Sequence, residues 1–457
     1  MTDSAKQQYD KMTKTPIYPL LISLSIPTII TMLVTSVYNM ADTAFVGTLG
    51  TSESGAVGVV FGFMAILQAI GFFFGQGCGT IMSRELGAKK QQDANISVST
   101  GFFMSLIISV CVAVITFFNL DVVVTMLGST KTIAPYAKTY IKYILISTPF
   151  IVPSFTLNNI LRFEGRAKLG AIGMMSGAIL NISLDAVFMF IFNMGIAGAG
   201  LATCLSQIIS FIILFTMFLR KKTQTVISFR LFTNDVKKLA NIAGTGLPSL
   251  LRQSLQSVSV VVLNYLAKPY GDPAISAMSI VSRITFFVFS IGLGFGQGFQ
   301  PISSFNFGAK KYARVREAHK KTLIVSQIMI SILSIIVLIF SKNLIRIFRD
   351  DAEVILIGTR ALRLQIISLI SLPYCMSTEM LLQTTGNKLS SSILSSCRSG
   401  IIFVPVIFIL AYTRGLSGIQ EAQPLTYVLS CIPTFFFLNS FLKKLPKEDV
   451  DDVVSRC

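Results

Sequence analysis

The most constraining feature of this chain is a series of long apolar runs that extends from residue 17 to residue 442. A helix needs about 20 mostly apolar residues to cross the roughly 30 Å hydrocarbon core of a bilayer. Twelve runs reach this length, and the gaps between them are too short for a soluble domain. The sequence therefore predicts an all-α integral membrane protein with twelve transmembrane helices. The predicted spans are residues 17–46, 54–82, 95–118, 136–161, 168–192, 195–219, 240–267, 274–304, 322–341, 358–383, 391–413 and 424–442.

Composition and charge argue against several classes of protein. Charged residues make up 13% of the chain, about half their usual share in soluble proteins. The 39 Lys and Arg exceed the 21 Asp and Glu, which in a soluble chain would suggest nucleic-acid binding. Here the basic residues gather in short gaps between apolar runs, so the lipid bilayer and not nucleic acid is the expected partner. A single histidine, His319, and the absence of clustered cysteines argue against an enzyme or a metal centre.

The distribution of Lys and Arg predicts the orientation of the chain. If the N-terminus lies in the cytoplasm, 26 of the 39 basic residues fall in cytoplasmic segments. The opposite loops, with the first helical turns beside them, hold ten. Because basic residues are enriched in cytoplasmic loops, both termini are expected in the cytoplasm.

An internal repeat sets the expected architecture. When the sequence is shifted by 221 residues, the stretch 27–90 aligns with 248–311 without a gap. Two identical blocks are unlikely to recur in register by chance, so each half of the chain is expected to contain the same six spans. The identical blocks are Gly-Gln-Gly at 75–77 and 296–298, and Gly-Ala-Lys-Lys at 87–90 and 308–311.

Six spans in each half return the chain to its starting side, so both halves insert with the same orientation. Two six-helix lobes are then related by a pseudo-twofold axis along the membrane normal, and rocking of the lobes exposes the cleft between them to either side. Duplication alone does not establish transport, since channels and scaffolds also duplicate. The expected parts are a cytoplasmic tail at 1–16, an N-lobe at 17–219, a cytoplasmic linker at 220–239, a C-lobe at 240–442 and a cytoplasmic tail at 443–457.

Glycines and prolines predict where helices pack closely or bend. Gly71, Gly75 and Gly79 recur every four residues, a spacing typical of close contact between membrane helices. Pro27 and Pro248 occupy equivalent positions in the first helix of each half, where proline is expected to kink the helix. Such a kink either lets the helix bend when a charge nearby changes or serves packing alone.

Polar residues inside the spans of the N-terminal half predict a cation site. Asp42 lies late in the first span and Asp185 lies in the fifth. A carboxylate inside hydrocarbon is costly and usually has a task. Asn181 lies four residues before Asp185 and shares its helix face, and Thr203 in the sixth span offers another oxygen. The candidate cation-coupling residues are Asp42, Asn158, Asn159, Asn181, Asp185 and Thr203.

The coupling ion is H⁺ or Na⁺, and no other cofactor is expected. A desolvated pair of carboxylates is suited to bind a proton, and the same oxygens suit a hard cation such as Na⁺. The repeat-equivalent positions of the two acids are Leu263 and Val406, so the halves differ in chemistry. The alternative is a hydrogen-bonded network that only holds helices together. If the ion is Na⁺, the metal ligands are Asp42, Asn181, Asp185 and Thr203.

The C-terminal half contributes a predicted substrate cleft. Glu379 is expected either to attract a cationic substrate or to form a salt bridge with Arg283 or Arg398. Gln253 and Gln256 either line the cleft or bridge helices. Buried arginines, Arg252 among them, are expected to pair with acids or carbonyls or to extend outward. The cleft candidates are Glu379, Gln253, Gln256 and Arg283.

Several segments together resemble the multidrug and toxic compound extrusion (MATE) family, in its MepA-like branch. The resemblance covers essentially the whole chain. Each segment alone is a weak signal, but together they are specific. They are YNMADTAFVG at 38–47, GAKK at 87–90 and 308–311, Gly165 after Arg162, NISLD at 181–185, and GIAGAGLAT at 195–203.

The resemblance implies two six-helix lobes and cation-coupled export of drugs, often amphipathic organic cations, across the plasma membrane of a prokaryote. Related prokaryotic members use an Asp on helix one, an Asn and an Asp on helix five and a Thr on helix six. Other branches place an acid on helix seven, where this chain has Gln253 and Gln256, so a cation site in the C-lobe is not expected. The Asp, Asn, Asp and Thr used by the related prokaryotic members match Asp42, Asn181, Asp185 and Thr203 of this chain.

The predicted function is secondary active efflux by a monomer. H⁺ or Na⁺ enters from outside and binds at Asp42 and Asp185, the first helix bends, and a small organic compound leaves the outward-facing cleft. One alternative is a flippase for lipid-linked saccharides, which the arginines of the C-lobe favour and the buried acids disfavour. Another is a membrane receptor or channel that does not couple transport to a gradient.

Overall fold

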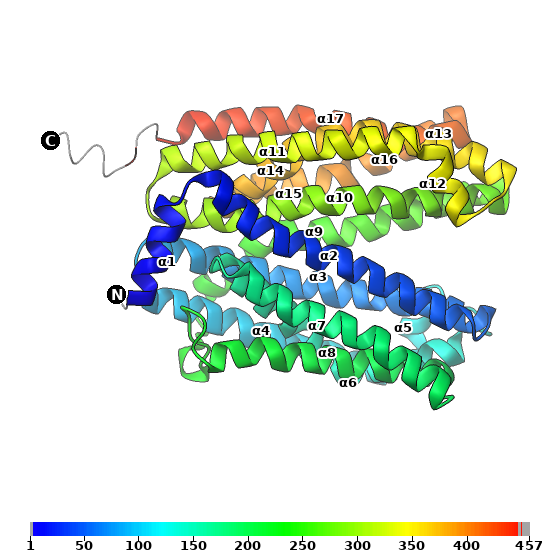
Figure 1. Cartoon of the computed structure of the whole chain (residues 1–457), viewed down its shortest axis with the longest axis horizontal. Coiled ribbons are helices and arrows are strands. Elements are labelled where there is room, and N and C mark those ends of the chain that lie inside the picture. The colour runs from blue at the N-terminus through cyan, green and yellow to red at the C-terminus, as the bar shows by residue number, and fades with distance from the viewer. Residues whose placement is uncertain (1–2, 447–448, 450–457) are drawn as a thin grey trace. The chain divides into compact units, whose positions relative to one another are not determined.

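The computed structural model describes residues 3–446 and residue 449, and helices account for most of them (Figure 1). No β-strand occurs within these residues. Most of the predicted spans correspond to one long helix, whereas several in the C-terminal half are built from consecutive shorter helices. The helices of the first half are α1 (Asp3–Lys14), α2 (Ile17–Gly47), α3 (Thr51–Gly87), α4 (Gln91–Phe118), α5 (Leu120–Met126), α6 (Ala134–Phe163), α7 (Ala167–Ala186), η1 (Val187–Ile191), α8 (Gly195–Leu219) and η2 (Phe229–Leu231). Those of the second half are α9 (Val236–Ala267), η3 (Lys268–Tyr270), α10 (Gly271–Gly308), α11 (Tyr312–Ile339), α12 (Ser341–Phe348), α13 (Ala352–Ser368), η4 (Leu369–Ser371), α14 (Leu372–Thr384), α15 (Lys388–Ser396), η5 (Cys397–Ile401), α16 (Phe403–Arg414) and α17 (Leu416–Lys444).

The expected all-α membrane architecture is confirmed. Within the described residues, eleven helical segments are long and apolar enough to cross a bilayer, and each coincides with a predicted span. The twelfth predicted span, 240–267, lies in α9, which is 32 residues long. This length is sufficient for a span. The stretch is less apolar than the other spans because it contains Arg252, Gln253, Gln256 and Asn264.

The helices pack as two compact units that exchange two segments. Unit 1 contains the described residues up to Lys11 together with Ile30–Leu250, and unit 2 contains Met12–Ile29 and the described residues from Leu251 onward. The breaks after Ile29 and after Leu250 are 221 residues apart, so they fall at equivalent positions of the internal repeat. Each unit therefore receives the first part of the other half's leading helix.

Close backbone contact explains the exchange in unit 1. The start of α9 packs on α3 at two glycines, Gly246 and Gly77. A Cβ atom on Gly77 would lie 2.5 Å from the carbonyl oxygen of Ile242, and one on Gly246 would overlap the carbonyl oxygen of Phe73. Real Cβ atoms essentially never approach other atoms this closely. The two helices reach this separation because neither glycine has a side chain.

The equivalent contact occurs in unit 2. Here the start of α2 packs on α10, and a Cβ atom on Gly298 would lie 2.8 Å from the Cα atom of Ser25. Gly298 and Ser25 are the repeat equivalents of Gly77 and Gly246. The Gly-Gln-Gly block of each half thus receives the leading helix of the other half.

A second glycine face of α3 contacts α6, which belongs to the same unit. A Cβ atom on Gly71 would lie 2.5 Å from Phe155, and one on Gly75 would lie 2.7 Å from Asn159. Gly79 meets α6 in the same way. The spacing of four residues therefore marks a close helix–helix contact, as predicted from the sequence.

We expect Gly77→Ala and Gly246→Ala to destabilise the protein, because each adds a methyl group where a carbonyl of the neighbouring helix fills the space. Overpacking of this kind costs about 1–3 kcal/mol of folding free energy. Gly58→Ala on α3 is the control, because nothing lies within 4 Å of its added Cβ atom. Thermal unfolding in detergent measures the effect, and equal midpoints for Gly246→Ala and Gly58→Ala would contradict the packing.

The linker between the two repeats is held against unit 1 by a buried carboxylate. Glu164, in the loop between α6 and α7, is 2% exposed. It accepts hydrogen bonds from the backbone amides of Thr225 at 2.9 Å and Gln224 at 3.1 Å, and another from the Thr225 hydroxyl. On α4, the Asn95 side chain accepts from the amide of Val226 at 3.1 Å. The linker is therefore attached along part of its length.

Glu164→Ala should detach this part of the linker, because it leaves the amides of Gln224 and Thr225 without their acceptor. An unsatisfied buried group costs about 1–3 kcal/mol. Faster hydrogen exchange at these two amides is the expected result, and Glu164→Gln, which keeps an acceptor oxygen, should show a smaller increase. Unchanged exchange in Glu164→Ala would show that the carboxylate does not hold the linker.

Candidate functional site

A cluster of buried polar side chains lies inside unit 1. Four helices contribute: Asp42 comes from the late part of α2, Tyr140 from the first turns of α6, Asn181 and Asp185 from α7, and Thr203 from α8. Each of the five side chains is at most 3% exposed. Four of these residues are the predicted cation ligands, so tertiary packing brings together groups that are far apart in the sequence.

Hydrogen bonds connect four of the five residues. The Tyr140 hydroxyl donates to Oδ2 of Asp42 at 3.4 Å and pairs with Oγ1 of Thr203 at 3.0 Å. Nδ2 of Asn181 donates to the same Thr203 oxygen at 3.2 Å. Asp185 lies one helical turn beyond Asn181, on the same face of α7. The result is a continuous polar chain from α2 through α6 and α8 to α7.

Several oxygens of the cluster have no hydrogen-bond donor within the described residues. They are Oδ1 of Asp42, Oδ1 of Asn181 and both carboxylate oxygens of Asp185. A buried acceptor without a donor is costly, and a buried carboxylate without a counter-charge is more so. A proton or a small hard cation satisfies such oxygens. The described residues contain no group of three or more His, Cys, Asp or Glu side chains, which would suit a transition metal instead.

The structure does not bring Asn158 and Asn159 to this cluster. Asn159 follows Tyr140 by nineteen residues on α6, which corresponds to about 28 Å along a helix axis. Its side-chain oxygen accepts a hydrogen bond of 2.5 Å from Arg162. Asn158 lies against Gly170 at the start of α7. Both asparagines therefore lie at the other end of unit 1.

Glu379 forms a buried salt bridge in unit 2, with a partner other than those predicted. Nη1 of Arg252 lies 2.6 Å from its carboxylate, and the hydroxyl of Ser395 donates to the same oxygen at 2.6 Å. Arg252 is 5% exposed and Glu379 is 2% exposed. The prediction of Arg283 or Arg398 as the partner was wrong, because Arg283 is exposed and α9 places Arg252 beside α14.

The two glutamines of α9 have different surroundings. Oε1 of Gln256 accepts a hydrogen bond of 3.2 Å from Ser399, which joins α9 to η5. Gln253 is partly exposed. Gln256 thus bridges helices, one of the two roles considered from the sequence.

A family model described as MatE matches residues 27–187 and 248–409, more than half of the chain. The chain belongs to the MatE family. The two matched segments begin at Pro27 and Pro248, which are also the first residues of the two stretches that align in the internal repeat. Membership confirms the family predicted from the sequence and identifies a multi-pass transporter rather than an enzyme.

Relatives and solved structures agree with the MatE assignment. The multidrug export protein MepA of Staphylococcus saprophyticus is 28% identical over 89% of this chain and 90% of its own length. MepA of Staphylococcus haemolyticus is 27% identical over 94% of this chain and 95% of its own. An outward-facing multidrug resistance MATE transporter superposes with a TM-score of 0.89, at 24% identity, over 94% of this chain and 97% of that structure. A MATE structure in a bent conformation gives 0.88, at 24% identity, over 97% and 98%.

Sequence reasoning missed Tyr140, which joins the acid of α2 to the threonine of α8 in this MatE protein. One signal was available, because a tyrosine at hydrocarbon depth needs a partner for its hydroxyl. The sequence does not indicate which residue is the hydrogen-bond partner of this hydroxyl. Only the packing of α6 between α2 and α8 does so.

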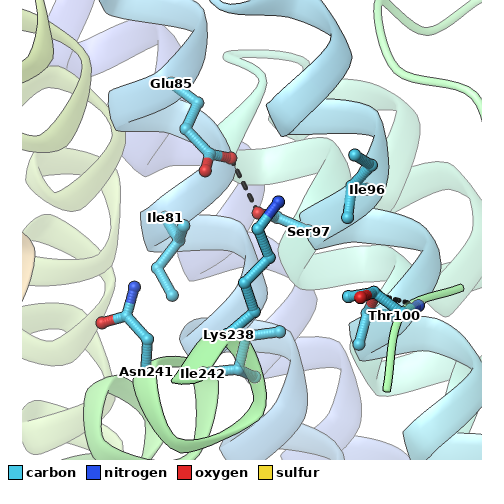
Figure 2. A pocket seen from close by; sticks show the side chains of 9 residues that line it. Ile81, Glu85, Ile96, Ser97, Thr100, Lys238, Asn241 and Ile242 are labelled. Atoms are coloured by element: carbon cyan, nitrogen blue, oxygen red, sulfur yellow. Dashed lines mark hydrogen bonds between the residues drawn. The ribbon is translucent and has the colours of Figure 1, made fainter. Parts of the chain in front are cut away.

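A separate polar hollow lies where α3, α4 and the start of α9 meet in unit 1 (Figure 2). Ser97 donates a hydrogen bond of 2.8 Å to Glu85, and Lys238 pairs with Asp93 at 3.6 Å. The hollow holds about 30 Å³, room for about one water molecule. It is too small for an organic substrate, so it does not compete with the acidic cluster as the functional site.

Tyr140→Phe should weaken the polar cluster while preserving its packing, because only the hydroxyl is removed. One such hydrogen bond contributes about 0.5–1.5 kcal/mol, and a double-mutant cycle with Thr203→Val should show a coupling of about 0.5–3 kcal/mol. Tyr143→Phe on the same helix is the control, since the Tyr143 hydroxyl makes no hydrogen bond within the described residues. Thermal unfolding provides the energies, and purely additive effects would show that the hydroxyls do not interact.

Proposed function

We propose that this MatE protein exports amphipathic organic compounds in exchange for H⁺ or Na⁺ by alternating access. The observation that carries the proposal is the buried cluster of unit 1, whose two carboxylates leave three oxygens without a donor. Such a site has a high affinity for a cation and a high cost when empty. The staphylococcal relatives are named multidrug export proteins, which supports organic compounds as the cargo.

The fold suggests how cation binding drives the exchange. Asp42 lies on α2, and α2 contributes Ile17–Ile29 to unit 2 and Ile30–Gly47 to unit 1. Neutralising Asp42 removes the cost of a buried anion and changes how the second part of the helix packs. The helix α2 is continuous and contains Pro27, close to the boundary between the units after Ile29. A change in the packing of Ile30–Gly47 therefore also moves Ile17–Ile29, which belongs to unit 2. The outward-facing state then releases its cargo.

Topology and assembly form part of the same proposal. The lobes 17–219 and 240–442, after exchange of the first parts of α2 and α9, act as the two moving bodies, joined by the linker 220–239. The protein works as a monomer in the plasma membrane of a prokaryote and does not bind nucleic acid. Its tails, 1–16 and 443–457, lie in the cytoplasm, and most of the second tail is outside the described residues. The excess of Lys and Arg on one side of the spans supports this orientation.

Asp42→Asn and Asp185→Asn should each reduce gradient-driven export to background, because an amide cannot bind a proton and is a poorer ligand for Na⁺. Proteoliposomes with an imposed pH or Na⁺ gradient and a fluorescent cationic dye provide the measurement. Asp121→Asn is the control, since the Asp121 side chain is 81% exposed. Comparing the two gradients identifies the ion.

Two outcomes would contradict the proposal. Dye movement that ignores both gradients in the unmodified protein would rule out coupling and favour a receptor, channel or flippase. Full coupled flux in both variants would show that the acids of unit 1 only hold helices together.

A further inference from the structure

Arg398 of unit 2 is a buried cation that makes no hydrogen bond within the described residues. It lies in η5, between α15 and α16, and is 3% exposed. Its Nε and Nη2 atoms have no acceptor. The other buried arginine of this unit, Arg252, has the carboxylate of Glu379 at 2.6 Å. Unit 2 therefore contains one more buried positive charge than it neutralises.

The acids of unit 2 whose side chains are described do not compensate Arg398. They pair with other basic side chains, cap helices or are exposed. The guanidinium instead has the ring of Phe289 at 5.3 Å from its central carbon. An aromatic face attracts a cation but accepts no in-plane N–H bond, so the donors stay unsatisfied. A buried donor without an acceptor is uncommon in folded proteins and calls for an explanation.

A second donor without a well-aligned hydrogen bond lies on α17, beside a tyrosine that is also near this arginine. Tyr427 of α17 is near both Arg398 and Gln423, which is one helical turn before it. Nε2 of Gln423 approaches the Tyr427 hydroxyl but forms no well-aligned hydrogen bond within the described residues, and this side chain is 8% exposed. Arg398 and Gln423 thus each carry an N–H donor without a well-aligned acceptor. A carboxylate fits such a site, because its two oxygens accept from a guanidinium fork and from an amide together.

The backbone at Arg398 resembles the backbone beside the cation site of unit 1. The segment Cys397–Ile401 is a π-helical turn, in which the amide of Ile402 donates to the carbonyl of Cys397 at 3.1 Å. In unit 1, the π-helical turn Val187–Ile191 follows Asp185 directly after Ala186. Isolated π turns within helices occur often at functional sites. The corresponding helix of each unit contains a π turn and a buried charge of opposite sign, at positions that are not equivalent in the repeat.

We propose that Arg398, assisted by Gln423, binds a carboxylate on the exported compound. The protein then favours zwitterionic amphiphiles, which carry a cationic group and a carboxylate, over purely cationic ones. This inference rests on the proposed export function and adds to it a substrate class and the residues that select it. Arg398 acts as a specificity-determining residue and takes no part in cation coupling.

Binding of two matched dyes tests the inference. Tetramethylrhodamine methyl ester is a cation, and its free acid is a zwitterion with the same ring system. We expect the purified protein to bind the free acid roughly tenfold more tightly, as measured by fluorescence polarisation without any gradient. Arg398→Met should remove this preference and leave the affinity for the ester within about threefold. Arg349→Gln, which removes an exposed guanidinium outside the candidate cleft, is the control and should keep the preference.

Thermal stability separates recognition from a structural role. Replacing an uncompensated buried charge by an apolar side chain of similar length should raise the unfolding temperature without ligand. A lower unfolding temperature for Arg398→Met would show that Arg398 supports the fold and would overturn the proposal. Gln423→Leu gives a second variant, and it should weaken binding of the free acid more than binding of the ester.

The binding experiment can fail independently of the export proposal, because it measures affinity and not gradient-driven flux. Equal binding of both dyes by the unmodified protein, or equal weakening of both by Arg398→Met, would overturn carboxylate recognition alone. Selective binding that persists when gradient-driven flux is absent would contradict only the coupling. Export of the ester under a gradient, with no preference for the free acid, would retain export and remove this inference.

Discussion

Close contact between helix backbones at the repeated Gly-Gln-Gly blocks is the constraint on which the rest of this structure depends. In hydrocarbon, helices gain little from hiding apolar side chains, so close packing decides which helices associate. Gly77 receives the start of α9, and Gly298 receives the start of α2. These two contacts account for the exchange of segments between the units. They also divide the long helices α2 and α9 between the two units, and α2 carries Asp42.

The two units share the helix arrangement of the internal repeat but differ in which buried charges are compensated. Unit 1 holds Asp42 and Asp185, whose free oxygens call for a cation. Unit 2 neutralises Glu379 with Arg252 and leaves Arg398 without an acceptor. Because a membrane offers little water to compensate such groups, we propose that each uncompensated charge binds a ligand during the transport cycle. On this view the cation binds in one unit and the anionic end of the substrate in the other.

The sequence was informative wherever a single helix carries the signal. Apolar length predicted the spans, the 221-residue repeat predicted two related halves, and the four-residue spacing of Gly71, Gly75 and Gly79 predicted a close contact. It was less informative wherever two helices must meet. The partner of Glu379 was missed because the choice among several arginines depends on which helix packs beside α14. Tyr140 was missed because an aromatic residue in an apolar run is ordinarily part of the packing.

The sequence by itself determined the helical membrane architecture, the duplication and the presence of costly acids within the spans. These properties follow from composition and periodicity along one chain, and the bilayer imposes them on each helix separately. Only the tertiary structure decided which segments exchange between the units, which oxygens remain unpartnered around Asp185, and which arginine is left uncompensated. Those outcomes depend on the rotation and depth of each helix against its neighbours, and contacts between residues far apart in the sequence set them.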